Sequence, residues 1–205
     1  LGYQPADFRA FGIPMENQQG AADSGFLHVY YGSADGLLPA NVERFNQESG
    51  GSTSELGDRY AESLATGDFN NDGFDDLAVG IPLEDLSGAV DAGFLHIYYG
   101  SGNGLDPLTV QRMDQEAGGS TSELGDQYAK ALIAGDFDND GFDDLAIGSP
   151  LEDQPGSIDS GFVHVFFGAG AGLIPASVER LDQEDGGSTS ETDDRYGRAL
   201  AAGDL

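Results

Sequence analysis

The segment Phe26-Leu-His-Val-Tyr-Tyr-Gly32 returns as Phe94-Leu-His-Ile-Tyr-Tyr-Gly100 and again as Phe162-Val-His-Val-Phe-Phe-Gly168. Each return comes 68 residues after the last, and Gly67-Asp68 recurs with the same step as Gly135-Asp136. Self-similarity at a fixed period is the sequence signature of a repeat architecture. Because the period contains no insertion or deletion, we expect all copies to share one conformation.

Each copy contains four short apolar runs separated by clusters of Gly, Asp, Asn and Pro, which indicates four strands. In the second copy the strands are expected at Tyr60–Asp68, Asp76–Ile81, Phe94–Tyr99 and Leu108–Met113. The third strand is nearly all apolar, as in a strand covered on both faces, and the fourth is mixed, as in an outer strand. The pattern predicts an all-β fold of β-propeller blades. A β-solenoid or a string of small β-domains is the alternative.

The number of copies is small for a closed propeller, which has about four to eight blades. The 205 residues form a single array, 1–205, of three repeats that span residues 1–68, 69–136 and 137–204. We therefore expect a partial propeller, or one completed by association of chains. Leu205 is in register with Leu1, so the strand expected at Gly197–Gly203 could pair with Phe8–Pro14 of another copy.

The connection between the first two strands of a copy carries the chemistry. It reads Asp68-Phe-Asn-Asn-Asp-Gly-Phe-Asp-Asp76 and, one period later, Asp136-Phe-Asp-Asn-Asp-Gly-Phe-Asp-Asp144. Oxygen side chains at alternate positions, a glycine for the sharp turn and a closing carboxylate suit Ca²⁺, a hard cation that takes six to eight oxygen ligands. We expect the metal ligands to be Asp68, Asn70, Asp72, Phe74 (carbonyl) and Asp76, and Asp136, Asp138, Asp140, Phe142 (carbonyl) and Asp144.

These loops differ from an EF-hand, which needs Glu at position 12 and a following helix. Position 12 is Val79 or Ile147, inside a β-patterned run, so the site is strand-loop-strand. Magnesium is less favoured because it prefers a tight octahedron with several waters. The first copy, Gly2–Phe8, lacks the pattern and is a degenerate loop, and Asp204 has no partners for a further one. The alternative is that these loops are acidic turns that bind nothing.

Charge and composition exclude several classes of function. Asp and Glu number 37 against 8 Lys and Arg, for a formal net charge of −29, which argues against nucleic acid or an anionic membrane as partner. The absence of cysteine excludes disulfides and thiolate metal sites. No apolar stretch approaches the roughly 18 residues of a membrane span. Leu1–Asp7 has neither a basic start nor a long apolar run, so no signal peptide is expected there.

Gly67-Asp-Phe-Asn-Asn-Asp-Gly73, followed by Asp76-Leu-Ala-Val-Gly-Ile-Pro82, resembles the FG-GAP repeat of the integrin alpha-chain β-propeller, and the copy ending at Gly148-Ser-Pro150 resembles it too. Leu56 replaces the usual Phe before Gly57, and Ile or Ser replaces Ala in the Gly-Ala-Pro signature. The resemblance implies a seven-bladed propeller with calcium between strands one and two of some blades. It also implies an extracellular or cell-surface setting and a role in adhesion or ligand binding.

His28, His96 and His164 share one position in the third strand. A zinc site needs ligands that converge within about 2 Å of the ion, and equivalent positions in successive blades should lie further apart. We therefore expect each imidazole to be hydrogen-bonded within its sheet. Tyr30, Tyr31, Tyr98 and Tyr99 are expected in the core rather than as sugar platforms.

The notable acids recur at the period instead of forming one singular constellation, and the chain has no cysteine nucleophile or Gly-x-Ser-x-Gly elbow, so we expect no enzyme. The leading hypothesis is a calcium-binding, extracellular, non-enzymatic β-propeller module for adhesion or for binding a protein or carbohydrate ligand. The alternatives are a structural subunit that self-associates head to tail into a ring or surface filament, and an accessory part of a secreted hydrolase. Solvated loops or a ligand face are expected around Leu83–Asp91 and Gln115–Glu123, away from the calcium loops.

Overall fold

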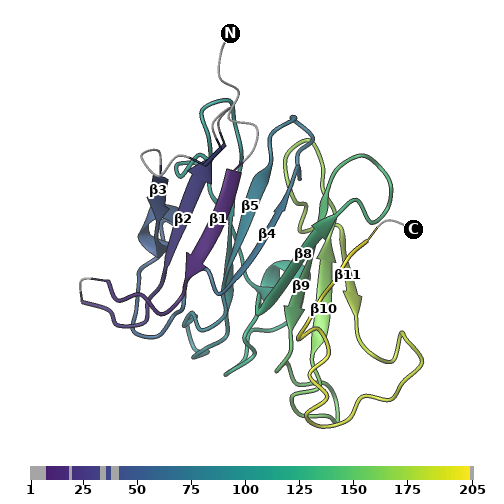
Figure 1. Ribbon diagram of the computed structural model, residues 1–205. Coiled ribbons are helices and arrows are strands. Elements are labelled where there is room, and N and C mark those ends of the chain that lie inside the picture. Colours follow the sequence, from purple (N-terminus) through teal and green to yellow (C-terminus); the bar gives the residue numbers. More distant parts are fainter. Residues whose placement is uncertain (1–7, 19, 33–35, 38–41, 204–205) are drawn as a thin grey trace.

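The strands of this chain form three antiparallel sheets that stand side by side in sequence order (Figure 1). The computed structural model describes residues 8–18, 20–32, 36–37 and 42–203. The first sheet consists of β1 (Phe8–Ile13), β2 (Phe26–Tyr31) and β3 (Val42–Phe45). The second consists of β4 (Ser63–Gly67), β5 (Asp76–Ile81), β6 (Phe94–Tyr98) and β7 (Gln111–Met113). The third consists of β8 (Ala131–Gly135), β9 (Asp144–Ser149), β10 (Phe162–Phe166) and β11 (Val178–Leu181).

The predicted all-β fold of blade-like units is confirmed. Every sheet is a simple meander in which each strand pairs with the next along the chain. The sheets do not close into a ring (Figure 1). Only the first sheet departs from the expected four strands. The position one period before β4 falls ahead of residue 1, so no strand equivalent to β4 lies among the described residues.

Three strands of the second sheet are shorter than predicted: β6 ends at Tyr98 rather than Tyr99, and β4 and β7 begin late for local reasons. The inner strand begins at Ser63 rather than Tyr60, because Arg59 and Ala61 adopt left-handed backbone conformations with φ of 56° and 65°. The outer strand begins at Gln111 rather than Leu108. Oδ1 of Asp106 accepts from the amide of Leu108 at 2.8 Å and holds that segment in a turn. Middle strands β5 and β9 keep their predicted starts, at Asp76 and Asp144.

The core lies between neighbouring sheets. Strand β5 is buried throughout, and its alternate residues face opposite neighbours. Leu77 and Val79 pack with Leu27 and Val29 of the first sheet, whereas Ala78 packs with Leu145 and its neighbours in the third. Fully burying one such aliphatic side chain contributes about 1.5–3 kcal/mol. Contact between adjacent sheets therefore supplies much of the stability.

Each sheet is also tied to the next through backbone atoms. Tyr60, at the entry to the second sheet, forms a parallel bridge with Gly25 of the first, and Tyr128 does the same with Gly93. Gly25 has a φ of +86°, and a β-carbon there would lie 2.4 Å from the carbonyl oxygen of Tyr60. A side chain at Gly25 would therefore push adjacent sheets apart.

The helices in the described part of the chain are two 3₁₀ turns, η2 (Gln47–Gly50) and η3 (Gln115–Gly118). Neither is long enough to cross a bilayer. Both follow the last strand of a sheet, at the end opposite the acidic loops. They lead the chain into the next sheet.

Candidate metal centre

The acidic loop between β4 and β5 curls around its own side chains. Both carboxylate oxygens of Asp68 accept backbone amides, Oδ1 from Asp72 at 3.0 Å and Oδ2 from Gly73 at 2.9 Å. Asn70 Oδ1 accepts from Asp72, also at 3.0 Å, and Asp72 Oδ1 accepts from Phe74 at 3.0 Å. The residues at predicted positions 1, 3 and 5, Asp68, Asn70 and Asp72, thus belong to one turn. Their side-chain oxygens accept hydrogen bonds from backbone amides of that turn.

Two residues in each loop have left-handed backbones. These are Asn71 (φ 52°) and Gly73 (φ 90°), with Asn139 (φ 61°) and Gly141 (φ 95°) one period later. Asn and Gly are the residues that adopt this region most readily. The glycine was expected from the need for a sharp turn. The asparagine at position 4 was not expected, although its repetition in both loops was a signal.

The second loop, between β8 and β9, brings three predicted ligands together. Carboxylate oxygens of Asp136, Asp138 and Asp144 all lie within 4.8 Å of one another. Calcium–oxygen distances of about 2.3–2.6 Å place ligand oxygens up to about 5 Å apart across the ion. The donor set and its spacing therefore fit one hard cation. Asp140, also predicted as a ligand, is not part of this group.

The first loop differs at position 3, where Asn70 stands in place of Asp138. Among the described residues no group of three acids gathers there. The neutral amide oxygen of Asn70 can still ligate calcium, but the loop carries less negative charge. The two loops are therefore expected to differ in affinity.

The closing carboxylates, Asp76 and Asp144, are fully buried. Asp76 Oδ2 accepts from the amide of Phe69 at 3.0 Å and Oδ1 from that of Gly100 at 2.7 Å. Asp144 repeats the pattern with Phe137 at 2.7 Å and Gly168 at 2.8 Å. Burial raises the pKa of Asp76 to about 7 and also raises the pKa of Asp144, while these amide bonds oppose the rise. Each closing carboxylate thus joins its loop to the end of the third strand.

The acid at position 8, Asp143, has a role that the sequence analysis missed. Its Oδ2 accepts from the amide of Asp68 at 2.8 Å, and its own amide donates to the carbonyl of Asp68 at 3.1 Å. Asp68 is position 1 of the neighbouring loop. The two acidic loops are therefore joined directly, through a residue whose repetition at Asp75 and Asp143 was the only sequence signal.

A second set of acids lies at the opposite end of the sheets. Gln115 Nε2 donates to Asp126 at 2.6 Å, to Glu152 at 3.0 Å and to the carbonyl of Thr121. Burial raises the pKa of both acids. One period earlier, Gln47 bonds Glu84 and the carbonyl of Thr53 in the same way. We call each such group a glutamine clamp: a Gln and an Asp from one connection, and a Glu from the loop after the second strand of the next sheet.

The two glutamine clamps are not identical. Ser149 Oγ donates to Oε1 of Gln115 at 3.3 Å. Ile81 occupies the position equivalent to Ser149 and offers no donor, so Oε1 of Gln47 is buried without a partner. The clamps fall within the two connections that the sequence analysis placed away from the calcium loops, but their partners come from different sheets.

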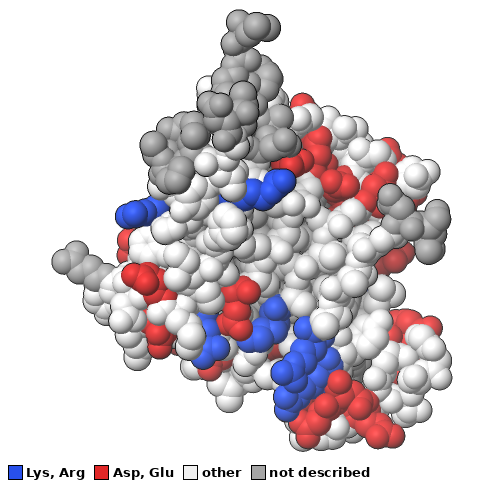
Figure 2. All heavy atoms as spheres, in the orientation of Figure 1, with Lys and Arg blue, Asp and Glu red and all other residues white. Residues whose placement is uncertain are grey.

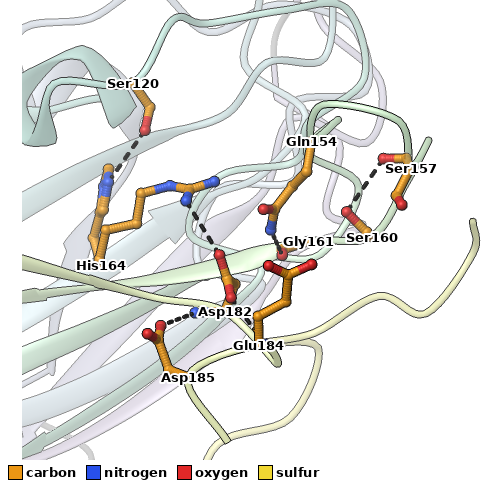
Figure 3. A network of polar contacts seen from close by, with 10 residues as sticks. Ser120, Gln154, Ser157, Ser160, Gly161, His164, Asp182, Glu184 and Asp185 are labelled. Carbon is orange, nitrogen blue, oxygen red and sulfur yellow. Dashed lines mark hydrogen bonds and ion pairs between the residues drawn. The ribbon is translucent and has the colours of Figure 1, made fainter. Parts of the chain in front are cut away.

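His96 bonds within its sheet as expected, since its Nδ1 lies 3.4 Å from the hydroxyl of Tyr98, but His96 and His164 are also bonded across sheets. His96 Nε2 lies 3.0 Å from Ser52 Oγ and His164 Nε2 lies 3.3 Å from Ser120 Oγ, and each serine belongs to the connection that precedes the sheet. Figure 3 shows His164 and Ser120 pointing toward each other from these two elements. Within the described residues no histidine joins a metal-ligating group. Burial lowers the pKa of His96 to about 3, so its ring is neutral.

Of the tyrosines expected in the core, Tyr98 is fully buried and its hydroxyl lies 2.8 Å from that of Tyr60. Tyr30, Tyr31 and Tyr99 are half-buried. The degenerate loop Gly2–Asp7 and the terminal Asp204 lie outside the described residues.

A family model for the FG-GAP repeat matches residues 60–98 and 130–166. This chain carries FG-GAP repeats. Each matched segment contains an inner strand, an acidic loop and the next two strands of one sheet. The FG-GAP match therefore covers both acidic loops and the strands that hold them.

Curated relatives of the FG-GAP array include two groups of proteins. It is 32% identical to integrin alpha-4 of Xenopus laevis over 65% of this chain, and 29% identical to integrin alpha-7 of Mus musculus over 94%. It is also 32% identical to the phosphatidylinositol-glycan-specific phospholipase D of Rattus norvegicus over 76% of this chain. The matches span only 12%, 14% and 18% of those three relatives, respectively. FG-GAP repeats thus accompany an enzyme in one group and an integrin chain in the other.

Proposed function

We propose that this FG-GAP array is a calcium-stabilised, non-enzymatic binding module that works outside the cell or at its surface. The observation that carries the proposal is the convergence of Asp136, Asp138 and Asp144 within 4.8 Å. Three carboxylates so close repel one another, and a divalent cation removes that repulsion. The family match adds support, since it covers both loops.

Calcium would act here as a structural ion. Asp136 and Asp138 belong to the loop, Asp144 begins β9, and Asp143 connects the loop to Asp68 of the preceding sheet. An ion bound by the first three residues would fix the β8–β9 connection and, through Asp143, the packing of adjacent sheets. Asp140 and the carbonyl of Phe142 are the other proposed ligands of this ion. A second site in the first loop would use Asp68, Asn70, Asp72, the carbonyl of Phe74 and Asp76.

The binding role is proposed for the loops at the opposite end, within Leu83–Asp91 and Gln115–Glu123. They are acidic and rich in hydroxyl groups, which suits a protein with a basic surface or a carbohydrate as ligand. We further propose that residues 1–205 act as one array with repeats at 1–68, 69–136 and 137–204. The calcium loops would then support the structure, away from the ligand.

Thermal unfolding with calcium, with magnesium and with excess chelator tests the calcium site. A ligand that binds only the folded chain stabilises it by about 2.7 kcal/mol at one hundred times its Kd. We expect calcium to raise Tm well above the value in chelator, and magnesium to do so much less. Asp136→Ala together with Asp144→Ala should remove the part of this rise that the second loop contributes.

Asp153→Ala is the matched control. Asp153 Oδ1 also accepts a backbone amide within a loop, that of Asp159 at 2.9 Å, but at the opposite end of the sheet. This variant should keep the full calcium response. An equal response from both variants would contradict a site in the acidic loop.

The phospholipase D relatives favour a second candidate, an accessory module of a secreted hydrolase. In that case the catalytic groups lie in another part of the enzyme and this array binds or positions its substrate. The array alone should hydrolyse no phosphodiester or glycoside. Activity that disappears in Glu152→Gln but persists in Glu84→Gln would instead identify a singular catalytic site and contradict both roles.

A further inference from the structure

A series of polar side chains lies buried between the first and second sheets. The hydroxyl of Tyr98 lies 2.8 Å from the hydroxyl of Tyr60 and 3.4 Å from Nδ1 of His96. All three side chains are fully buried. The other ring nitrogen of His96, Nε2, lies 3.0 Å from Oγ of Ser52. The hydroxyl of Tyr98 therefore gives both the phenol of Tyr60 and the imidazole a hydrogen-bond partner inside this interface.

The interface between the second and third sheets repeats this arrangement with one hydroxyl fewer. Tyr128, His164 and Phe166 hold the three equivalent positions, each one period further along the chain. All three are fully buried. Phe166 takes the place of Tyr98 and carries no hydroxyl. The second interface therefore contains the same two polar rings without the side-chain group that joins them in the first.

The rings of the two interfaces have closely matching geometry. The ring centroids of Tyr128 and His164 lie 6.0 Å apart with an interplanar angle of 69°, and the equivalent pair in the first interface lies 6.0 Å apart at 64°. The centroids of His164 and Phe166 lie 5.7 Å apart at 87°, and their equivalents lie 6.0 Å apart at 79°. The position of the Tyr98 hydroxyl can therefore be transferred to the second interface, where it falls at the ring edge of Phe166.

Two polar atoms lie beside that position. The hydroxyl of Tyr128 and Nδ1 of His164 are buried, and neither has a hydrogen-bond partner among the described residues. The other side of the imidazole is bonded, since Nε2 lies 3.3 Å from Oγ of Ser120 (Figure 3). Buried polar groups are nearly always paired with protein atoms or with ordered water. The two atoms are the equivalents of those that Tyr98 joins, so one oxygen atom at the transferred position would satisfy both.

Glycine keeps this position free of other side-chain atoms. In the first interface a β-carbon on Gly50 would lie 2.8 Å from the hydroxyl of Tyr98. Gly118 is its equivalent in the second interface, where a β-carbon would lie 2.4 Å from Nδ1 of His164. The second interface therefore offers an oxygen atom the same surroundings that hold the hydroxyl in the first.

The surroundings suit a neutral ligand that can both donate and accept hydrogen bonds. Burial lowers the pKa of His164 to about 4, and the charge of Arg180 adds to the effect, so the ring is neutral at pH 7. Burial raises the pKa of Tyr128 well above its ordinary value, so the phenol keeps its proton. A neutral imidazole nitrogen donates or accepts according to the tautomer, and a phenol can do both. A water molecule matches either case, and buried waters typically have two to four polar partners.

We propose that one water molecule binds in the core between Tyr128 and His164, at the position that the hydroxyl of Tyr98 occupies in the preceding interface. The water completes a series of hydrogen bonds from Ser120 through the imidazole to Tyr128. It thus joins the connection before the third sheet, the middle strand β10 and the entry to that sheet. The site is specific to this interface, because a tyrosine side chain fills the equivalent position in the first. It does not depend on calcium binding by the acidic loops.

Crystal structures of the full chain at atomic resolution test the proposal. In the native chain one ordered water should lie within hydrogen-bond distance of the Tyr128 hydroxyl and of Nδ1 of His164. Phe166→Tyr should displace this water, because the new hydroxyl lies at the same position. Tyr98→Phe is the converse change and should create an equivalent water site in the first interface.

Thermal unfolding gives a second measurement of the same site. Phe166→Tyr should raise Tm by about 2–4 °C, because the hydroxyl bonds both polar atoms without immobilising a water molecule. Phe162→Tyr is the matched control. Phe162 is also fully buried and lies on the same face of β10, but no unpartnered group awaits a hydroxyl there, so this variant should have a lower Tm than the native chain.

Three results would overturn the proposal. One is a native structure in which the position holds no water, or in which Tyr128 and His164 bond other protein groups. Another is a water that remains between the two rings in Phe166→Tyr. The third is a fall in Tm for Phe166→Tyr as large as that for Phe162→Tyr, since an added hydroxyl would then find no partner at either position.

Discussion

The imidazole of His164 packs against the α-carbon of Gly118, which belongs to the connection before its sheet. A β-carbon on Gly118 would lie 2.3 Å from Cε1 and 2.4 Å from Nδ1 of the ring. The same relationship holds between His96 and Gly50. Glycine here creates the space in which a side chain from the next sheet sits, and serine two residues later bonds that side chain.

Gly118→Ala should therefore be destabilising. The backbone of Gly118 is not in the left-handed region, so the loss of stability arises from displacing His164. Overpacking of this kind lowers the free energy of unfolding by about 1–3 kcal/mol. Chemical denaturation measures it. Gly186→Ala is the matched control, because Gly186 stands one period later and its nearest neighbour, the carbonyl oxygen of Gln183, would lie 3.4 Å away. Equal losses in the two variants would rule out the imidazole as the cause.

The glutamine clamp of the first two sheets should make stability depend on pH. Burial raises the pKa of Glu84 to about 8 and that of Asp58 to about 6, and the charge of Asp58 adds to the rise for Glu84. The folded chain then holds protons that the unfolded chain has released above its ordinary carboxyl range. Stability from these groups is therefore greatest at low pH and falls as pH rises toward 8.

Glu84→Gln tests this dependence. The amide mimics the protonated acid, so the variant should melt higher than the native chain at pH 8 and at nearly the same temperature at pH 5. The Tm values are measured at constant free calcium, so that differences in calcium binding by the acidic loops do not contribute to them. A lower Tm for the variant at pH 8 would show that the ionised carboxylate is the favoured form.

Asn70→Asp should make the first acidic loop resemble the second. The added carboxylate strengthens binding of a divalent cation but increases repulsion with Asp68 and Asp72 when no cation is present. We expect a higher Tm than native in calcium and a lower one in chelator. Asp138→Asn should do the opposite in the second loop. For either variant, a Tm shift of the same sign in calcium and in chelator would contradict an effect linked to the ion.

Tyr99 joins adjacent sheets through its hydroxyl, which accepts from the amide of Leu173 at 3.2 Å and donates to Gln111. Tyr99→Phe should cost about 1 kcal/mol, because a partly buried amide and a side-chain oxygen lose their partner. The control is Tyr30→Phe, since Tyr30 lies on the outer side of the first sheet and its hydroxyl has no partner among the described residues. Denaturant midpoints of the two variants give the comparison.

Local pattern predicted most of each sheet. Strand β5 begins and ends where its apolar run predicted, from Asp76 to Ile81, just before Pro82. The inner strand was predicted too long because nothing in the apolar pattern marks Arg59 and Ala61 as left-handed. Such conformations depend on the bridge between Tyr60 and Gly25, which joins residues of different sheets.

The candidate site also has a part that the sequence predicted and a part that depends on contacts between repeats. Spacing alone selected Asp136, Asp138 and Asp144, which the structure brings together. It did not reveal that Asp143 reaches the neighbouring loop, nor that the bond of His96 goes to Ser52 of another connection. Periodicity defines what one repeat looks like, whereas these contacts depend on how two repeats stack.

Asp143 has a consequence for how the two acidic loops respond to ions. In the sequence it lies between two proposed ligands of its own loop, Phe142 and Asp144, and it bonds both the amide and the carbonyl of Asp68 in the other loop. If calcium binds both loops as proposed, an ion that orders either loop should lower the entropic cost of ordering the other, which makes binding cooperative. Because such coupling is reciprocal, we expect an array of these repeats to respond to calcium over a narrower concentration range than its loops would separately.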